Sequence, residues 1–166
     1  SNARLRVVHP DGTGGRLVPT RTPTDVMYPA WTPSGRISYS YWSAAPFDWP
    51  AACRRPASYC GYVVSSRLDG SGRRRVLRGR DGHWSKAGST ITYTGSDGGV
   101  FTAAGSGGAG RMLGRGYRAE WSRDSSQIVY ARMGNTPSQD SIWIMNSDGG
   151  SPHRIFSGRS FPASQP

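Results

Sequence analysis

A short segment built around a tryptophan occurs three times in the chain, and this repeat constrains the fold more than any other feature. Each tryptophan is followed eight or nine residues later by a tyrosine that ends a second, apolar stretch. Self-similarity of this kind is typical of repeat architectures, in which each unit is one supersecondary element. The three segments are 28–35, 82–88 and 119–125, and the apolar stretches behind them are 37–39, 91–93 and 128–130.

Two further stretches complete each repeat. A third apolar stretch runs into a glycine-containing pair that favours a hairpin turn, and a fourth short stretch follows. The turn residue and the next tryptophan are separated by 15 positions in both cases, from Asp69 to Trp84 and from Ser106 to Trp121. The pattern predicts four short antiparallel strands per repeat. The third stretches are 62–65, 100–103 and 142–145, and the fourth are 75–77, 111–113 and 154–156.

Four strands per unit, with a tryptophan on the first and a glycine turn before the fourth, are typical of a β-propeller blade. The repeats resemble the blades of TolB-like and WD40-like propellers, in which Pro-x-Trp-Ser-Pro-Asp-Gly precedes an Ile-x-Tyr strand and an Asp-x-x-Gly hairpin. The resemblance covers nearly the whole chain, although Trp84 lacks the preceding proline and the turn aspartate is kept only at Asp124. It implies an all-β fold, an arc of about three and a half four-stranded antiparallel blades, and says little about function because propellers host unrelated activities.

The repeats also divide the chain. Propellers close with about four to eight blades, and an open arc exposes sheet edges to association. We therefore expect either a homodimer that joins two arcs or a longer propeller of which this chain is a part. The expected units are 1–3, a remnant of a cleaved tag; 4–24, the third and fourth strands of a partial blade; 25–80, 81–117 and 118–159, three blades; and 160–166, a tail that resembles the start of another.

One insertion distinguishes the first full blade. Trp31 to Asp69 spans 38 residues against 22 for Trp84 to Ser106, and the excess of 16 matches residues 43–58. Long loops on rigid scaffolds are where binding tends to occur, and aromatic and arginine side chains anchor interfaces. The alternative is that the insertion's aromatic residues cover an exposed blade end. The expected partner-binding residues are Phe47, Trp49, Arg54 and Arg55 in the insertion, with Arg78 and Arg80 leading toward the same face.

Both cysteines, Cys53 and Cys60, fall at the ends of the insertion's second half. We predict a disulfide between them, which fits an extracytoplasmic location, whether secreted, periplasmic or surface-anchored. Two cysteines cannot complete a structural zinc site, and the three histidines lie at different places in the repeats. No metal and no cofactor is therefore expected. No apolar run approaches the roughly 20 residues that cross a bilayer, so no membrane insertion by this segment is expected.

The net charge of +11 comes from twenty arginines and one lysine, Lys86. One interpretation is recognition of phosphate or carboxylate groups, and the other is a codon preference that replaces lysine throughout. The arginines are scattered instead of forming the single stripe of a nucleic-acid surface, so nucleic-acid or polyanion binding remains only an alternative. The one dense cluster is Arg73, Arg74, Arg75, Arg78 and Arg80.

Enzyme motifs are scarce. The sequence at 105–110 matches GxGxxG, but a strand pattern follows where a dinucleotide site needs a helix, and no GxSxG motif occurs. The positions before each tryptophan would line the central channel, where Tyr28, His83, Arg118 and Glu120 are the candidates. We expect no catalysis, and a binding scaffold for a protein, a peptide or a cell-envelope polymer; the alternative is an enzyme of hydrolase or lyase type, or a regulatory propeller beside one.

Overall fold

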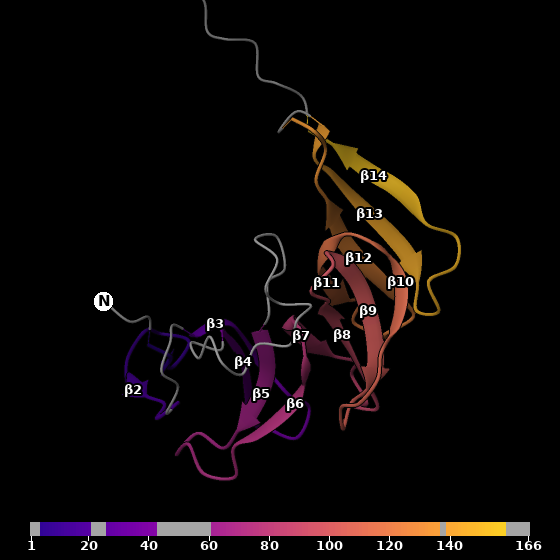
Figure 1. Cartoon of the computed structure of the whole chain (residues 1–166). Helices are drawn as coiled ribbons and strands as arrows, with labels where there is room; N and C mark the ends of the chain where they lie inside the picture. The colour runs from indigo at the N-terminus through magenta and orange to yellow at the C-terminus, as the bar shows by residue number, and fades with distance from the viewer. Residues whose placement is uncertain (1–3, 21–25, 43–60, 137–138, 159–166) are drawn as a thin grey trace, which may run out of the picture.

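The computed structural model describes residues 4–20, 26–42, 61–136 and 139–158, and its regular elements there are β-strands apart from a 3₁₀ position at Gln139. The strands form three four-stranded antiparallel sheets and one two-stranded sheet, each connected in sequence order. This confirms the predicted all-β arc of propeller blades (Figure 1). In the described part of the chain, no helix is long and apolar enough to span a membrane.

The sheets follow one another along the chain. We call the two-stranded sheet the N-terminal hairpin and the others blades 1, 2 and 3. The N-terminal hairpin holds β1 (Arg6–Val7) and β2 (Arg16–Leu17). Blade 1 holds β3 (Val26–Trp31), β4 (Ile37–Trp42), β5 (Gly61–Ser66) and β6 (Arg74–Arg78). Blade 2 holds β7 (Arg80–Trp84), β8 (Thr90–Thr94), β9 (Gly99–Ala104) and β10 (Arg111–Arg115). Blade 3 holds β11 (Tyr117–Trp121), β12 (Gln127–Arg132), β13 (Ser141–Asn146) and β14 (His153–Ser157).

The GxGxxG segment is a hairpin connection. It joins β9 to β10, which pair as antiparallel neighbours. A strand therefore follows the glycines, where a dinucleotide site needs the N-terminus of a helix.

The core lies between consecutive sheets. The second strand of each blade places an isoleucine and a tyrosine on one face, because residues two apart in a strand share a face. Ile91 and Tyr93 pack against Val63 and Leu77 of blade 1, and Ile128 and Tyr130 pack against Val100 of blade 2. Ile37 and Tyr39 pack likewise on Leu5 and Val18 from the N-terminal hairpin segment. Full burial of one such apolar side chain contributes about 1.5–3 kcal/mol to the free energy of folding.

The first strands, β3, β7 and β11, contact one another in turn and are the inner strands of the arc. Each contains a β-bulge at the same place, three residues before its tryptophan, and the bulged residue is not glycine. Tyr28, Asp81 and Arg118 have φ angles of 53°, 57° and 53°. A left-handed conformation costs a non-glycine residue roughly 1–3 kcal/mol, so the surrounding structure must hold it.

Hydroxyl groups on the second strand of one blade hold the bulge of the next. The Asp81 backbone N–H donates to Ser40 Oγ at 2.9 Å, and the Arg118 N–H donates to Thr94 Oγ1 at 3.3 Å. Two residues earlier in the same strand, Thr92 Oγ1 donates to the Ala119 carbonyl at 3.3 Å. The bulge residues Asp81 and Arg118 are therefore held by hydroxyl groups of the preceding blade.

Blade 3 departs from this arrangement. Its register places Val129 and Ala131 where blade 2 has Thr92 and Thr94. Neither side chain can accept a hydrogen bond. On the same face Ile142 is 39% exposed and Phe156 is 56% exposed, so this end of the arc presents an apolar surface.

Replacing Ser40 by alanine should lower the free energy of unfolding by about 1–3 kcal/mol, because the buried Asp81 N–H would lose its acceptor. Thr94→Val should also lower the free energy of unfolding, because the Arg118 N–H would lose its acceptor. The matched control is Ala131→Ser, which adds a hydroxyl where the described residues offer it no following bulge and should change stability by less than about 0.5 kcal/mol. Urea unfolding would measure all three, and equal effects at Ser40 and Ala131 would contradict the role of the hydroxyl.

Candidate functional site

The inner strands bring two of the four predicted channel residues into contact. His83 on β7 and Glu120 on β11 occupy equivalent positions in blades 2 and 3, directly before their tryptophans. Their side chains meet at 2.6 Å. Tyr28 and Arg118 lie at the bulge positions of β3 and β11, and none of the described contacts joins their side chains to this pair.

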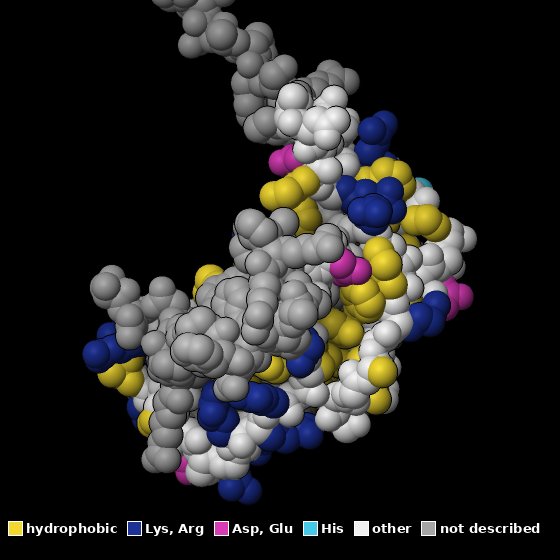
Figure 2. Space-filling view, in the orientation of Figure 1, with side chains coloured by type: hydrophobic (Ala, Val, Ile, Leu, Met, Phe, Trp, Pro, Cys, Tyr) yellow, Lys and Arg dark blue, Asp and Glu magenta, His cyan; other side chains and the backbone are white. Residues whose placement is uncertain are grey.

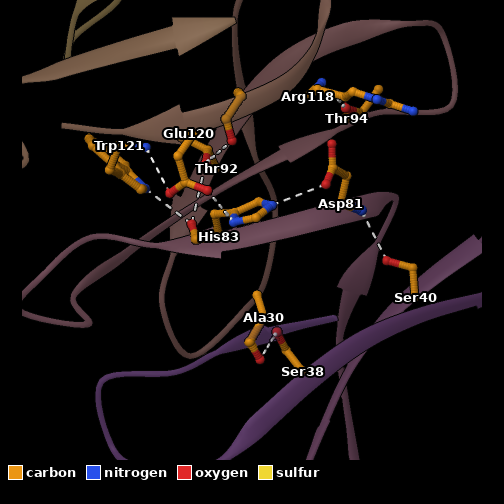
Figure 3. A network of polar contacts seen from close by, with 11 residues as sticks. Ala30, Ser38, Ser40, Asp81, His83, Thr92, Thr94, Arg118, Glu120 and Trp121 are labelled. Atoms are coloured by element: carbon orange, nitrogen blue, oxygen red, sulfur yellow. Dashed lines mark hydrogen bonds and ion pairs between the residues drawn. The ribbon is translucent and has the colours of Figure 1, made fainter. Parts of the chain in front are cut away.

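His83 is held between two carboxylates (Figure 3). Its Nε2 lies 3.0 Å from Asp81 Oδ1, and its Nδ1 lies 2.6 Å from Glu120 Oε2. The side chain of Asp81 is 8% exposed, that of His83 is 23% exposed and that of Glu120 is 53% exposed. The imidazole thus bridges blades 2 and 3 at the inner edge of the arc.

The backbone of His83 is fixed as well. Its carbonyl accepts a hydrogen bond from Trp121 Nε1 at 3.1 Å, and it shares the one hydroxyl hydrogen of Thr92 with the Ala119 carbonyl, each oxygen lying 3.3 Å from Thr92 Oγ1. Trp121 comes from the next blade, so its indole ties the two inner strands together. The repeated tryptophan therefore positions His83 in addition to filling space.

These neighbours determine the charge of His83. Burial by itself lowers the pKa of the imidazole, but hydrogen bonds to Asp81 and Glu120, with the attraction of both carboxylates, raise it to about 9. At neutral pH the ring is an imidazolium that donates from both nitrogens. A general base or a metal ligand needs a free nitrogen lone pair, whereas both ring nitrogens of His83 face carboxylate oxygens.

Asp81 was not among the predicted site residues. One of its carboxylate oxygens, Oδ2, is enclosed and has no hydrogen-bond partner among the described residues. Aligning the three repeats on their tryptophans places Asp81 at the positions of Tyr28 and Arg118, and that comparison could have identified it. Within the described residues, no group of three or more His, Cys, Asp or Glu side chains could hold a metal ion.

The predicted partner-binding residues are only partly described. Arg78 is exposed at the end of β6, and its guanidinium lies 6.0 Å from the centre of the Tyr62 ring. Arg80 begins β7 and is half-buried. The other predicted residues, including the disulfide pair, lie outside the described residues: Phe47, Trp49, Cys53, Arg54, Arg55 and Cys60.

Because the pKa of His83 is raised on folding, the ion pairs stabilise the fold fully below pH 6.5, and this stabilisation is lost as the pH rises through about 9. The effect should be on the order of 2 kcal/mol, reduced by the partial exposure of the site. His83→Gln should abolish this slope in the free energy of unfolding measured from pH 6 to 10. The control is exposed His153, whose replacement by glutamine should leave the slope in place; a His83→Gln curve parallel to wild type would refute the assignment.

No protein family model matches the chain, and no curated protein sequence matches it. Solved structures do match in fold. A putative TolB from Agrobacterium tumefaciens superposes with a TM-score of 0.65 at 17% identity, covering 95% of this chain and 55% of that one. An oligogalacturonate lyase in complex with manganese gives 0.60 at 15% identity, covering 88% and 42%, and TolB from Acinetobacter baumannii gives 0.51 at 14% identity, covering 93% and 49%. The chain spans about half the length of these structures. The chain therefore has the β-propeller fold of the TolB-like structures, with low sequence identity to each of them.

Proposed function

We propose that this chain is a binding module without catalytic activity of its own. The observation that carries the proposal is the placement of His83, whose two ring nitrogens both lie within hydrogen-bond distance of carboxylate oxygens. Proton transfer to or from a substrate requires a group that can reach the reacting atom in the right protonation state. The inner-strand histidine instead joins two blades, which is a structural task that supports a binding surface.

The competing function is that of a lyase or hydrolase. Asp81, His83 and Glu120 form an acid and base cluster at the inner edge of the fold, and one structure of similar fold carries the description of an oligogalacturonate lyase with manganese. A likeness at 15% identity concerns the fold alone. An assay of oligogalacturonate cleavage with added manganese separates the two functions, because cleavage that His83→Gln abolishes would overturn the binding proposal.

The binding surface we propose is the face that carries residues 43–58. These residues connect β4 to β5, where blade 2 needs only residues 95–98 between β8 and β9. Their aromatic and arginine content suits a protein, peptide or cell-envelope polymer. A Cys53–Cys60 disulfide and an extracytoplasmic location belong to the same proposal, while nucleic-acid binding is the weaker alternative.

Deleting residues 43–58 should leave the cooperative unfolding of the fold intact and abolish capture of partners from a cell-envelope extract. The reason is that the deletion shortens the β4–β5 connection to two residues and removes the aromatic and arginine residues predicted to bind the partner. Quantitative mass spectrometry of the captured material is the measurement. His83→Gln serves as the control and should retain capture, and an unchanged capture profile in the deletion variant would reject this face.

We further propose that two copies join head to tail into one ring. We call the side of blade 3 that points away from blade 2 its forward face; it carries Val129, Ala131, Ile142 and Phe156. This face is apolar and lacks the hydroxyl acceptors that a following inner strand requires. The N-terminal hairpin has no inner strand among the described residues, so it would not need those acceptors. An exposed surface of this kind is costly to leave in water.

Sedimentation should therefore give the mass of a dimer. Ile142→Asp, which places a charge on the exposed forward face of blade 3, should weaken association at least tenfold, since burying an unpaired carboxylate costs several kcal/mol. Leu17 is 51% exposed on the N-terminal hairpin, where the partner would pack. Leu17→Asp should therefore also weaken association at least tenfold. A monomer at all concentrations would exclude the shared ring.

A further inference from the structure

A second surface lies on the opposite face, where short turns join strand one to two and strand three to four. Two cavities open there, one of about 450 Å³ between blades 1 and 2 and one of about 560 Å³ beside the N-terminal hairpin. Ser34 and Arg36 line both, so the two cavities lie next to each other across blade 1, and we refer to them together as the groove. This groove contains none of the His83 network and none of the insertion.

The groove is strongly basic. Arg16, Arg36, Arg67 and Arg74 line it, and Asp69 is the one carboxylate among the lining residues. Figure 2 shows Lys and Arg side chains gathered over the lower part of the molecule, where β2, β5 and β6 lie in Figure 1. A cleft lined by one sign of charge focuses its field on an oppositely charged ligand.

Neutral groups hold three of these arginines in place. Arg36 donates to the Gly72 carbonyl, Arg74 Nη1 donates to the Ser106 carbonyl at 3.3 Å, and Arg67 Nη1 donates to Ser71 Oγ at 3.5 Å. Asp69 accepts a hydrogen bond from the Ser71 N–H at 2.9 Å. Hydrogen bonds from Ser71 hold the pKa of Asp69 below its usual value, helped by the nearby Arg67. The guanidinium groups are thus positioned while most of their charge stays uncompensated.

Two donors in the wall lack an acceptor. The hydroxyl of Ser65, a residue that is 1% exposed, lines the first cavity and has no hydrogen-bond partner among the described residues. The same holds for Arg36 Nε. Buried polar groups without a partner are rare because each costs about 1–3 kcal/mol. The wall behind the guanidinium groups is therefore polar and incompletely hydrogen-bonded, although both atoms are enclosed.

The next interblade cavity provides an internal comparison. Between blades 2 and 3 the equivalent space, about 560 Å³, is lined by one cation and one anion, Lys86 and Asp124. Asp124 is engaged by the hydroxyls of Ser122 and Ser126, which with the Ser126 N–H lower its pKa to about 2. The repeat therefore does not by itself produce a basic groove; blade 1 has one because of its own residues.

The chemistry of the wall favours a peptide. Pro33, Trp84 and Ala87 form an apolar side of the first cavity next to Arg36 and Arg74. Guanidinium groups match carboxylates through paired N–H donors. Single-stranded nucleic acids need free aromatic faces for stacking, whereas Trp84 is half-buried and its Nε1 donates to the Gly105 carbonyl at 3.0 Å. A uniformly charged polymer would leave the apolar side unused.

We propose that this groove binds an acidic peptide segment, with side-chain carboxylates on the arginines and an apolar side chain against Pro33 and Trp84. The ligand is extended, because the groove runs from β2 to the β9–β10 turn. The site is separate from the face that carries residues 43–58.

Fluorescence anisotropy with a labelled peptide of alternating glutamate and leucine tests the proposal on the full chain. Arg74→Gln and Arg67→Gln should each raise the Kd about tenfold, as expected for the loss of a charge-assisted hydrogen bond. The control, Arg123→Gln, removes the same charge from an exposed turn of blade 3 outside the groove and should change the Kd less than twofold. The variant without residues 43–58 should bind the peptide as wild type does.

Three results would overturn the proposal. One is an equal loss of affinity in Arg74→Gln and Arg123→Gln, which would show that net charge alone attracts the peptide. Another is equal binding of a peptide in which glutamine replaces glutamate. The last is tighter, Arg74-dependent binding of a single-stranded oligonucleotide or a polyuronate with the same number of charges, which would assign the groove to a polymer.

Discussion

The packing of one blade on the next is the interaction on which the rest of the structure depends. An isoleucine and a tyrosine from each second strand enter the preceding sheet, and hydroxyls on the opposite face of that strand fix the next inner strand. Apolar burial supplies most of the free energy without direction, whereas the hydroxyls specify where each inner strand bends. Asp81 and Arg118 keep their left-handed backbone conformation because hydroxyl groups of the preceding blade accept hydrogen bonds from their N–H groups.

This arrangement connects the fold to the candidate site. The β-bulge of β7 lies between Arg80 and His83 and contains Asp81. The Asp81 carboxylate contacts one ring nitrogen of His83, and Glu120 of β11 contacts the other. The strained conformation is thus located where the charged groups meet, as is common at functional sites. In this protein the result is a pair of contacts from His83 to Asp81 and Glu120, which join blades 2 and 3 at the inner edge of the arc.

The repeats were sufficient to predict the fold, because the tryptophan, tyrosine and glycine positions are read directly from the sequence and each has a local cause. The contact between His83 and Glu120 was within reach of the same reasoning, since both precede a repeat tryptophan. Asp81 was missed because its role depends on a β-bulge that places its carboxylate beside the ring of His83, and only aligning the three repeats on their tryptophans points to its position. The groove was missed for a different reason: Arg16, Arg36, Arg67 and Arg74 are scattered in sequence, and only the stacking of sheets brings them to one face.

The scatter of arginines along the chain therefore does not decide whether they act together. Each repeat contributes only one or two short turns to a given face, so a basic surface on a propeller is assembled from positions tens of residues apart. The cavity between blades 2 and 3, with Lys86 beside Asp124, shows that the same geometry can be nearly neutral. A codon preference would place arginine without regard to face, and it would not explain why the groove across blade 1 has four arginines and a single carboxylate. The charge of this chain is thus best understood blade by blade, with the short turns of blade 1 as its focus.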